Sequence, residues 1–215
     1  MSISVIEASS LGEGWLAVSR EILERGETAS YDGQATKELP LLTLVVEQPD
    51  SADPLIAELG DRDWLDWMHR NFTSPEDVPE LGRAKSYAVR LHDYGGTGRD
   101  QIDWVVDRLR GDPESRSAAI TTFQPLTDTS YIPCVSLLDF WLRDGAVELV
   151  VYAHSLDFGK KAYGNLVELA RLAEQVAGRL GRPAGALVVH AKSAHVYEPE
   201  WAVMAELCSA SSASA

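Results

Sequence analysis

The sequence contains few cysteines and comparatively few positive charges. Only Cys134 and Cys208 are cysteines among its 215 residues, so we expect reduced thiols and a cytoplasmic location rather than a disulfide framework. Lysine and arginine number 19 against 33 acidic residues, which gives a net charge of −14. Because nucleic-acid binding relies on a basic surface, this composition argues against such a partner. A small phosphorylated ligand needs only one or two local cations and stays possible.

Long apolar runs are also missing. No N-terminal stretch joins basic residues to a long apolar run, and no segment approaches the roughly 18 apolar residues that span a bilayer. We therefore expect neither a signal peptide nor a membrane partner. Residues 1–208 show no repeat and no linker, which predicts one domain. The low-complexity residues 209–215 are expected to form a disordered tail.

The hydrophobic periodicity indicates an α/β (α+β) domain. It predicts helices over 13–24, 102–109 and 161–180, and strands over 41–46, 118–123, 135–142, 147–152 and 187–190. Asp144-Gly145 favours a tight hairpin between two of these strands. Residues 51–86 are less regular, and we expect a short helix plus loops there. Their Trp64 and Trp67 either belong to the core or form a wall of a substrate site.

Cys134 follows Pro133 and immediately precedes an expected strand. A thiol at the end of a strand can face a cleft, whereas cysteine is often a small buried hydrophobic residue. His195 and Tyr197 alternate, so their side chains share one strand face, as a half-buried pair or as ligand contacts. Taken singly, these residues leave both interpretations open.

Several motifs, spread over residues 85–201, resemble thymidylate synthases. The nucleophile of that family lies in a Pro-Cys pair, as Pro133-Cys134 does here. Upstream, its Asp-Gln and Pro-x-Ser-Arg segments resemble residues 100–101 and 113–116. Downstream, its Tyr-x-Arg-Ser-x-Asp segment resembles residues 152–157. Short archaeal members are the most similar, because they share segments like residues 122–125 and 194–201.

Two spacings strengthen the resemblance. In the family an asparagine follows the aspartate by eight residues, which corresponds to Asp157 and Asn165, and a His-x-Tyr follows 30 residues later, at His195 and Tyr197. The resemblance implies a thymidylate synthase-like mixed β-sheet packed with helices, and a homodimer whose sheets pack back to back. Taken alone, Asp157 and Asn165 could equally be a capping group and its neighbouring loop.

The resemblance also implies a reaction. Cys134 would add to carbon 6 of a pyrimidine, so that carbon 5 accepts a one-carbon unit from 5,10-methylenetetrahydrofolate or a related tetrahydropterin. Asn165 would read a uracil-type ring, and Asp157 would hold the pterin. Tyr87 would help to remove the carbon-5 proton, although Tyr94-Gly95 also resembles the family's tyrosine motif. The implied substrate contacts are Arg25, Arg116, His154, Ser155, Asn165, His195 and Tyr197, and no metal ligand is expected.

The chain departs from the family pattern at the phosphate. His154 and Ser117 replace two arginines, which removes two permanent cations. The product is either methylated or hydroxymethylated, since the sequence resembles members without the long C-terminal segment that closes over folate. Two alternatives stay open: an enzyme of secondary metabolism acting on another nucleoside or heterocycle, and a non-catalytic ligand-binding descendant.

Overall fold

The structure, a computed structural model, describes residues 3–31, 33–75, 78–82, 84–128 and 132–212. Its strands are β1 (Ser4–Ala8), β2 (Glu27–Tyr31), β3 (Gln34–Val46), β4 (Ala119–Thr121), β5 (Val135–Arg143), β6 (Ala146–Ala153), β7 (Leu156–Asp157) and β8 (Ala184–Tyr197). Its helices are α1 (Leu11–Arg25), α2 (Pro54–Leu59), α3 (Arg62–Thr73), α4 (Tyr87–His92), α5 (Gln101–Gly111), α6 (Ala162–Leu180) and α7 (Trp201–Ser212), with short 3-10 turns η1 (Pro79–Leu81), η2 (Tyr94–Gly96) and η3 (Glu198–Glu200).

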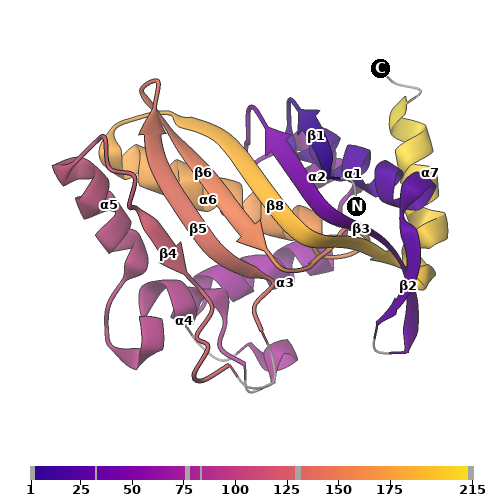
Figure 1. Cartoon of the computed structure of the whole chain (residues 1–215), viewed down its shortest axis with the longest axis horizontal. Helices are drawn as coiled ribbons and strands as arrows, with labels where there is room; N and C mark the ends of the chain where they lie inside the picture. The colour runs from indigo at the N-terminus through magenta and orange to yellow at the C-terminus, as the bar shows by residue number, and fades with distance from the viewer. Residues whose placement is uncertain (1–2, 32, 76–77, 83, 129–131, 213–215) are drawn as a thin grey trace.

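The strands form one mixed sheet in the order β1-β3-β8-β6-β5-β4 (Figure 1), with β2 on β3 and β7 on β8. β8 runs antiparallel to β3 and parallel to β6 and β7. This confirms the predicted α/β class and the mixed sheet packed with helices. None of the described helices is long and apolar enough to cross a membrane.

The two faces of the sheet differ in their cover. Figure 1 shows α6 and α3 behind the sheet, while the face toward the viewer carries none of the described helices. α6 is the central support, because Leu166, Leu169, Ala173 and Val176 are all buried. On the uncovered face Leu137, Trp141 and Tyr152 stay 38–42% exposed.

Most of the predicted elements form where local signals are strong. Asp144 and Gly145 both adopt positive φ, as the tight turn of the β5–β6 hairpin requires. The α6 helix ends at Gly181, whose φ of 66° is left-handed.

Other expectations were wrong. The strand predicted over 41–46 begins earlier, because β3 starts at Gln34 and runs through Pro40. Residues 51–86 contain α2 and α3, whose first turns are capped by the side chains of Asp53 and Asp61. Residues 209–212 are the last turn of α7 rather than a disordered tail, and residues 213–215 lie outside the described residues.

Candidate active site

A cavity of about 550 Å³ opens where β5, β7 and β8 meet α3 and α6, a volume typical of small-molecule sites. Eight of the ten residues expected at the site line it: Tyr87, Cys134, His154, Ser155, Asp157, Asn165, His195 and Tyr197. The sheet register explains why the residues on or beside the strands meet, because it aligns them in two rows across neighbouring strands.

The first row, which we call the thiol row, comprises Cys134, His154, Lys192 and Leu41. His154 donates its backbone N–H to the carbonyl oxygen of Cys134 at 3.0 Å. His154 lies level with Lys192, because Ala153 pairs with Ala191 and Leu156 with Ala194. Leu41 is opposite Lys192, and regular pairing is interrupted there, where Leu41 has a φ of 55°. The row thus places the thiol, an imidazole and an ammonium group side by side.

The second row, the histidine row, comprises Asp157, His195 and Glu38. Asp157 pairs with His195 across β7 and β8, and His195 pairs with Glu38 across β8 and β3. The next residue on the same face is Tyr197, whose ring packs edge-on against His195 at 5.1 Å. Burial raises the pKa of Asp157, and the charge of His195 opposes that shift. Burial likewise lowers the pKa of His195, against the charges of Asp157 and Glu38.

Two hydrogen bonds hold the backbone of Val135, the residue that follows Cys134. The hydroxyl oxygen of Tyr87 accepts the N–H of Val135 at 3.0 Å, and the buried hydroxyl of Thr122 donates to the Val135 carbonyl. This places Tyr87 at the cavity, whereas the Tyr94 hydroxyl donates to the Phe123 carbonyl and Tyr94 is not a lining residue. Of the two candidate tyrosines, Tyr87 is therefore the one beside the thiol.

Cys134 itself is partly exposed. Burial raises the pKa of its thiol, the positive charge of Lys161 lowers it, and the negative charge of Asp157 raises it further. Since the thiolate is the nucleophilic form, the balance between these charges decides the reactivity of the site.

Asn165 lies in the first turn of α6 and is only 4% exposed. Its side-chain nitrogen donates to the carbonyl oxygen of Lys161 at 3.0 Å. Because only an N–H can meet that carbonyl, the amide oxygen is turned the other way, and it is buried without a partner among the described residues. A buried acceptor of this kind needs a donor.

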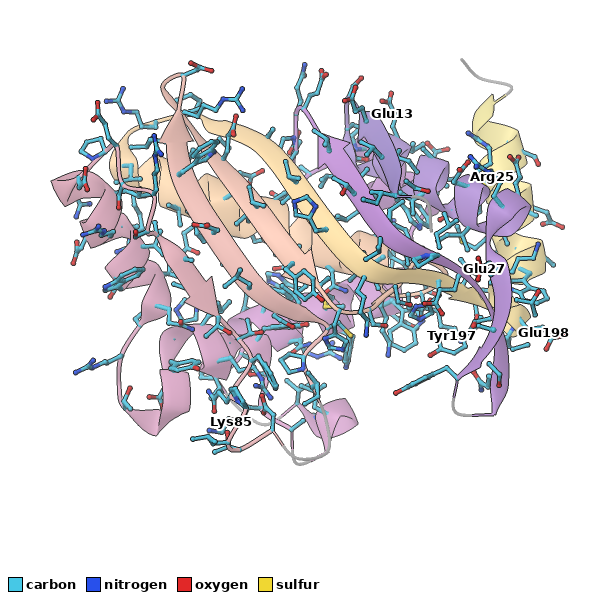
Figure 2. The ribbon with its side chains drawn as sticks, in the orientation of Figure 1. Glu13, Arg25, Glu27, Lys85, Tyr197 and Glu198 are labelled. Carbon is cyan, nitrogen blue, oxygen red and sulfur yellow. The ribbon has the colours of Figure 1, made fainter. Side chains whose placement is uncertain are left out.

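Two expected residues do not line the cavity. Arg25 is exposed at the end of α1 and pairs with Glu21 at 2.7 Å, and Figure 2 shows it well separated from Tyr197. Arg116 is exposed in the segment between α5 and β4. A single chain does not test what Arg116 does in the expected homodimer, and the roles of both arginines stay predictions.

Other lining residues were not anticipated. They include two lysines, Lys161 and Lys192, as well as Asn71 and Glu38. Trp67, for which the core and a cavity wall were both considered, is found in both places. A signal existed for Asn71, a polar residue on the buried stripe of α3 beside Trp67, Met68 and Phe72. No comparable signal marked the lysines, since most lysines lie in solvent.

The cavity thus brings together a partly exposed cysteine thiol and a buried side-chain amide. Comparison with known proteins agrees. Residues 35–214 match the family model described as Thymidylate synthase. The chain therefore belongs to the thymidylate synthase family, whose members transfer one-carbon units to carbon 5 of pyrimidines.

Individual relatives support this assignment. Two proteins named "Putative thymidylate synthase" are 31% identical over 201 residues (Methanosarcina mazei) and 30% identical over 200 residues (Methanosarcina acetivorans). Each alignment covers 92% of this chain and 91% of the relative. The Deoxyuridylate hydroxymethyltransferase of Bacillus phage SP01 is 35% identical over 104 residues, which are 46% of this chain and 27% of the phage protein. The chain is thus a pyrimidine C5 methyl- or hydroxymethyltransferase.

Proposed function

We propose that this enzyme transfers a one-carbon unit from a methylene-tetrahydropterin to carbon 5 of a uracil nucleotide, through a covalent adduct between Cys134 and carbon 6. The observation that carries this proposal is the meeting of Cys134, Asn165 and His195 in one cavity, from three separate elements. Attack of the thiolate forms a sulfur–carbon 6 bond and moves the ring's double-bond electrons toward carbon 5 and oxygen 4. The enolate so formed makes carbon 5 nucleophilic.

The orientation of Asn165 favours uracil over cytosine. Its unpaired amide oxygen is an acceptor, and N3 of uracil carries a proton to donate. N3 of cytosine carries none, so the same pairing would leave two acceptors facing each other, which is costly in a buried site. His195 and Tyr197 would hold the sugar from β8, and Tyr87 would help to remove the carbon-5 proton.

The thiol row contains a cation that could bind phosphate. Lys192 lines the cavity beside His154 and Ser155 and is the permanent cation of that row. Burial and the charge of Lys192 both lower the pKa of His154, so its imidazole favours the neutral form, and a bound anion would favour the protonated form. Lys192 thus compensates in part for the missing arginines, which supports a nucleotide over a nucleoside or an uncharged heterocycle.

Another part of the cavity lining, which includes Trp67 and Asp157, fits a pterin. Trp67 is 7% exposed, and its indole N–H is buried with no partner among the described residues. Asp157 lines the same cavity, and its carboxyl group could accept a hydrogen bond from a pterin N–H. When bound, 5,10-methylenetetrahydrofolate or a related tetrahydropterin supplies the one-carbon unit. The residues present would hold its ring between an aromatic wall and a carboxyl group.

Release of tritium from carbon 5 tests the Cys134 step without the pterin. We expect the protein to release tritium from 5-tritiated dUMP or UMP, and to release more when a methylene-tetrahydropterin is added. Mass spectrometry of the nucleotide would then distinguish a methyl from a hydroxymethyl product. The absence of any release from uracil or cytosine nucleotides and nucleosides would refute the proposed reaction.

We further propose that the uncovered sheet face is the homodimer interface. It carries an apolar cluster, in which Val150 and Val188 neighbour the exposed Tyr152 and Leu137. We expect light scattering to give the mass of two chains, and Tyr152→Glu to give the mass of one. Leu126→Glu is the matched control, because Leu126 is 96% exposed and lies outside the sheet. A monomeric wild-type protein would contradict this proposal.

A further inference from the structure

Lys161 is the only lysine or arginine besides Lys192 among the described residues that line the cavity. It is the N-cap residue of α6, between Asp157 and Asn165, and it uses its backbone for structure. Its N–H donates to the carbonyl of Asp157 at 3.0 Å, and its own carbonyl accepts from Asn165. The backbone of Lys161 therefore fixes both neighbours, while its side chain is available for another purpose.

The ammonium group of Lys161 lies over two indole rings. Its nitrogen is 5.3 Å from the ring centroid of Trp64 and 5.5 Å from that of Trp67, within the range of cation–π contacts. Within the described part of the chain it forms no ion pair with a carboxylate. The adjacent Lys160 differs in this respect, because its nitrogen lies 2.6 Å from the Glu200 carboxylate. Two neighbouring lysines thus have different environments, one neutralised and one held by aromatic rings at the cavity.

Lys161 and Cys134 line the same cavity, and Lys161 is the positive group whose charge acts on the thiol. It lowers the pKa of Cys134, against burial and the charge of Asp157. Lys192 acts on His154 instead. His154 occupies the position where the family resemblance places an arginine, and its pKa is lowered by burial and by Lys192. His154 therefore favours the neutral form, which gives the thiolate no charge.

We propose that Lys161, which lines the same cavity as Cys134 and is positioned over Trp64 and Trp67, is the counter-ion of the Cys134 thiolate. The proposal rests on the proposed function only in that the thiolate is the attacking group. The thiol loses its proton to solvent, and the sulfur electron pair then forms the bond to carbon 6. Lys161 stays an ammonium ion throughout and exchanges no proton. It is a positioning residue that acts through Cys134.

The rate at which iodoacetamide alkylates Cys134 between pH 6 and 10 tests this role without substrate. Intact mass and peptide mapping separate Cys134 from Cys208, which is 4% exposed. Removing a positive charge that lowers a thiol pKa raises that pKa. We therefore expect Lys161→Gln to shift the profile to higher pH and to slow alkylation at pH 7 by roughly three- to tenfold. Above the thiol pKa, the two proteins should react at similar rates, and matching circular dichroism spectra would show that the variant is folded.

Two further variants sharpen the test. Lys161→Arg keeps the charge and should restore most of the wild-type profile, whereas Lys160→Gln removes the same charge one residue away and should leave it unchanged. An unshifted profile for Lys161→Gln, or an equal shift for Lys160→Gln, would overturn the proposal. So would an effect of Lys161→Gln on nucleotide binding alone, because that would make Lys161 a substrate contact.

The outcome is separable from that of the proposed reaction. A shifted profile in a protein that releases no tritium would refute the pyrimidine chemistry and leave Lys161 as the counter-ion. Tritium release whose pH dependence is the same in wild type and in Lys161→Gln would support the reaction and refute the role of Lys161.

Discussion

The histidine row and the thiol row are three residues apart along β8, yet they differ in how their charges are balanced. In the histidine row, Asp157 and His195 face each other in the buried part of the pocket, and each shifts the pKa of the other toward its charged form. In the thiol row, Lys192 is exposed and its effect on His154 is repulsive. The charges of the histidine row are paired within the protein, whereas the positive charge of the thiol row would be paired only by an anion that binds from solution.

This difference suggests how the enzyme separates reaction from substrate choice. Asp157 and His195, which would hold the pterin and the sugar, have each other as partners. The groups that would bind phosphate gain their partner only when the substrate arrives. Changes in the first set should therefore abolish or redirect the chemistry, and changes in the second should alter which substrates bind.

Replacing the nucleophile should have the largest effect. Cys134→Ser substitutes a hydroxyl group that is hardly ionised near neutral pH, so tritium release should fall by on the order of 10³-fold or more. Nucleotide binding should persist, because the thiol row keeps Lys192 and His154. Cys208→Ala serves as the control, since Cys208 is buried against Leu16. Substantial release by Cys134→Ser would exclude covalent catalysis by this residue.

Asn165→Asp should redirect the ring preference. A protonated carboxyl group can donate to N3 of cytosine, which the present amide oxygen cannot. We expect the ratio of kcat/KM for cytosine over uracil nucleotides to rise roughly 100-fold. The ratio is its own control, because loss of folded protein lowers both values equally. An unchanged ratio would show that Asn165 does not read the ring.

Lys192→Gln should have a smaller, phosphate-specific effect. Losing one charge-assisted hydrogen bond of about 1.5 kcal/mol weakens monophosphate binding about tenfold and should leave nucleoside binding unchanged. Lys192 lowers the pKa of His154, so its removal raises that pKa. His154 is then protonated more readily as pH falls, and the deficit should shrink between pH 8 and pH 6. Calorimetry with dUMP and deoxyuridine would measure both effects, with Lys160→Gln as a control for net charge.

The sequence predicted the elements whose signals are local. The β5–β6 hairpin follows from Asp144-Gly145, and α6 follows from a long apolar stripe closed by Gly181. The polar clusters of residues 51–86 indicated loops, but Asp53 and Asp61 are helix caps, and aspartate is common in both settings. α7 was missed because its alanines and serines resemble a tail, whereas in the fold Cys208 packs on α1 through Leu16.

The site could be predicted where motif spacing carried it. Fixed separations linked Asp157, Asn165 and His195, and the structure brings these residues together. The roles of Lys161 and Lys192 depend on which side of a helix start or a strand faces the cavity. That direction is set by the register between strands that are distant in sequence, and no local pattern reports it.

The backbone of Leu41 has a final consequence. A left-handed conformation costs a non-glycine residue about 1–2 kcal/mol, and Leu41 adopts it opposite Lys192, at the break in strand pairing. Strain in the fold and the direction of Lys192, the proposed phosphate contact, therefore meet at the same position. Relaxing Leu41, for example to glycine, would remove strain from the fold but also loosen the strand pairing beside Lys192. This part of the enzyme is where selection for stability and selection for substrate binding would conflict.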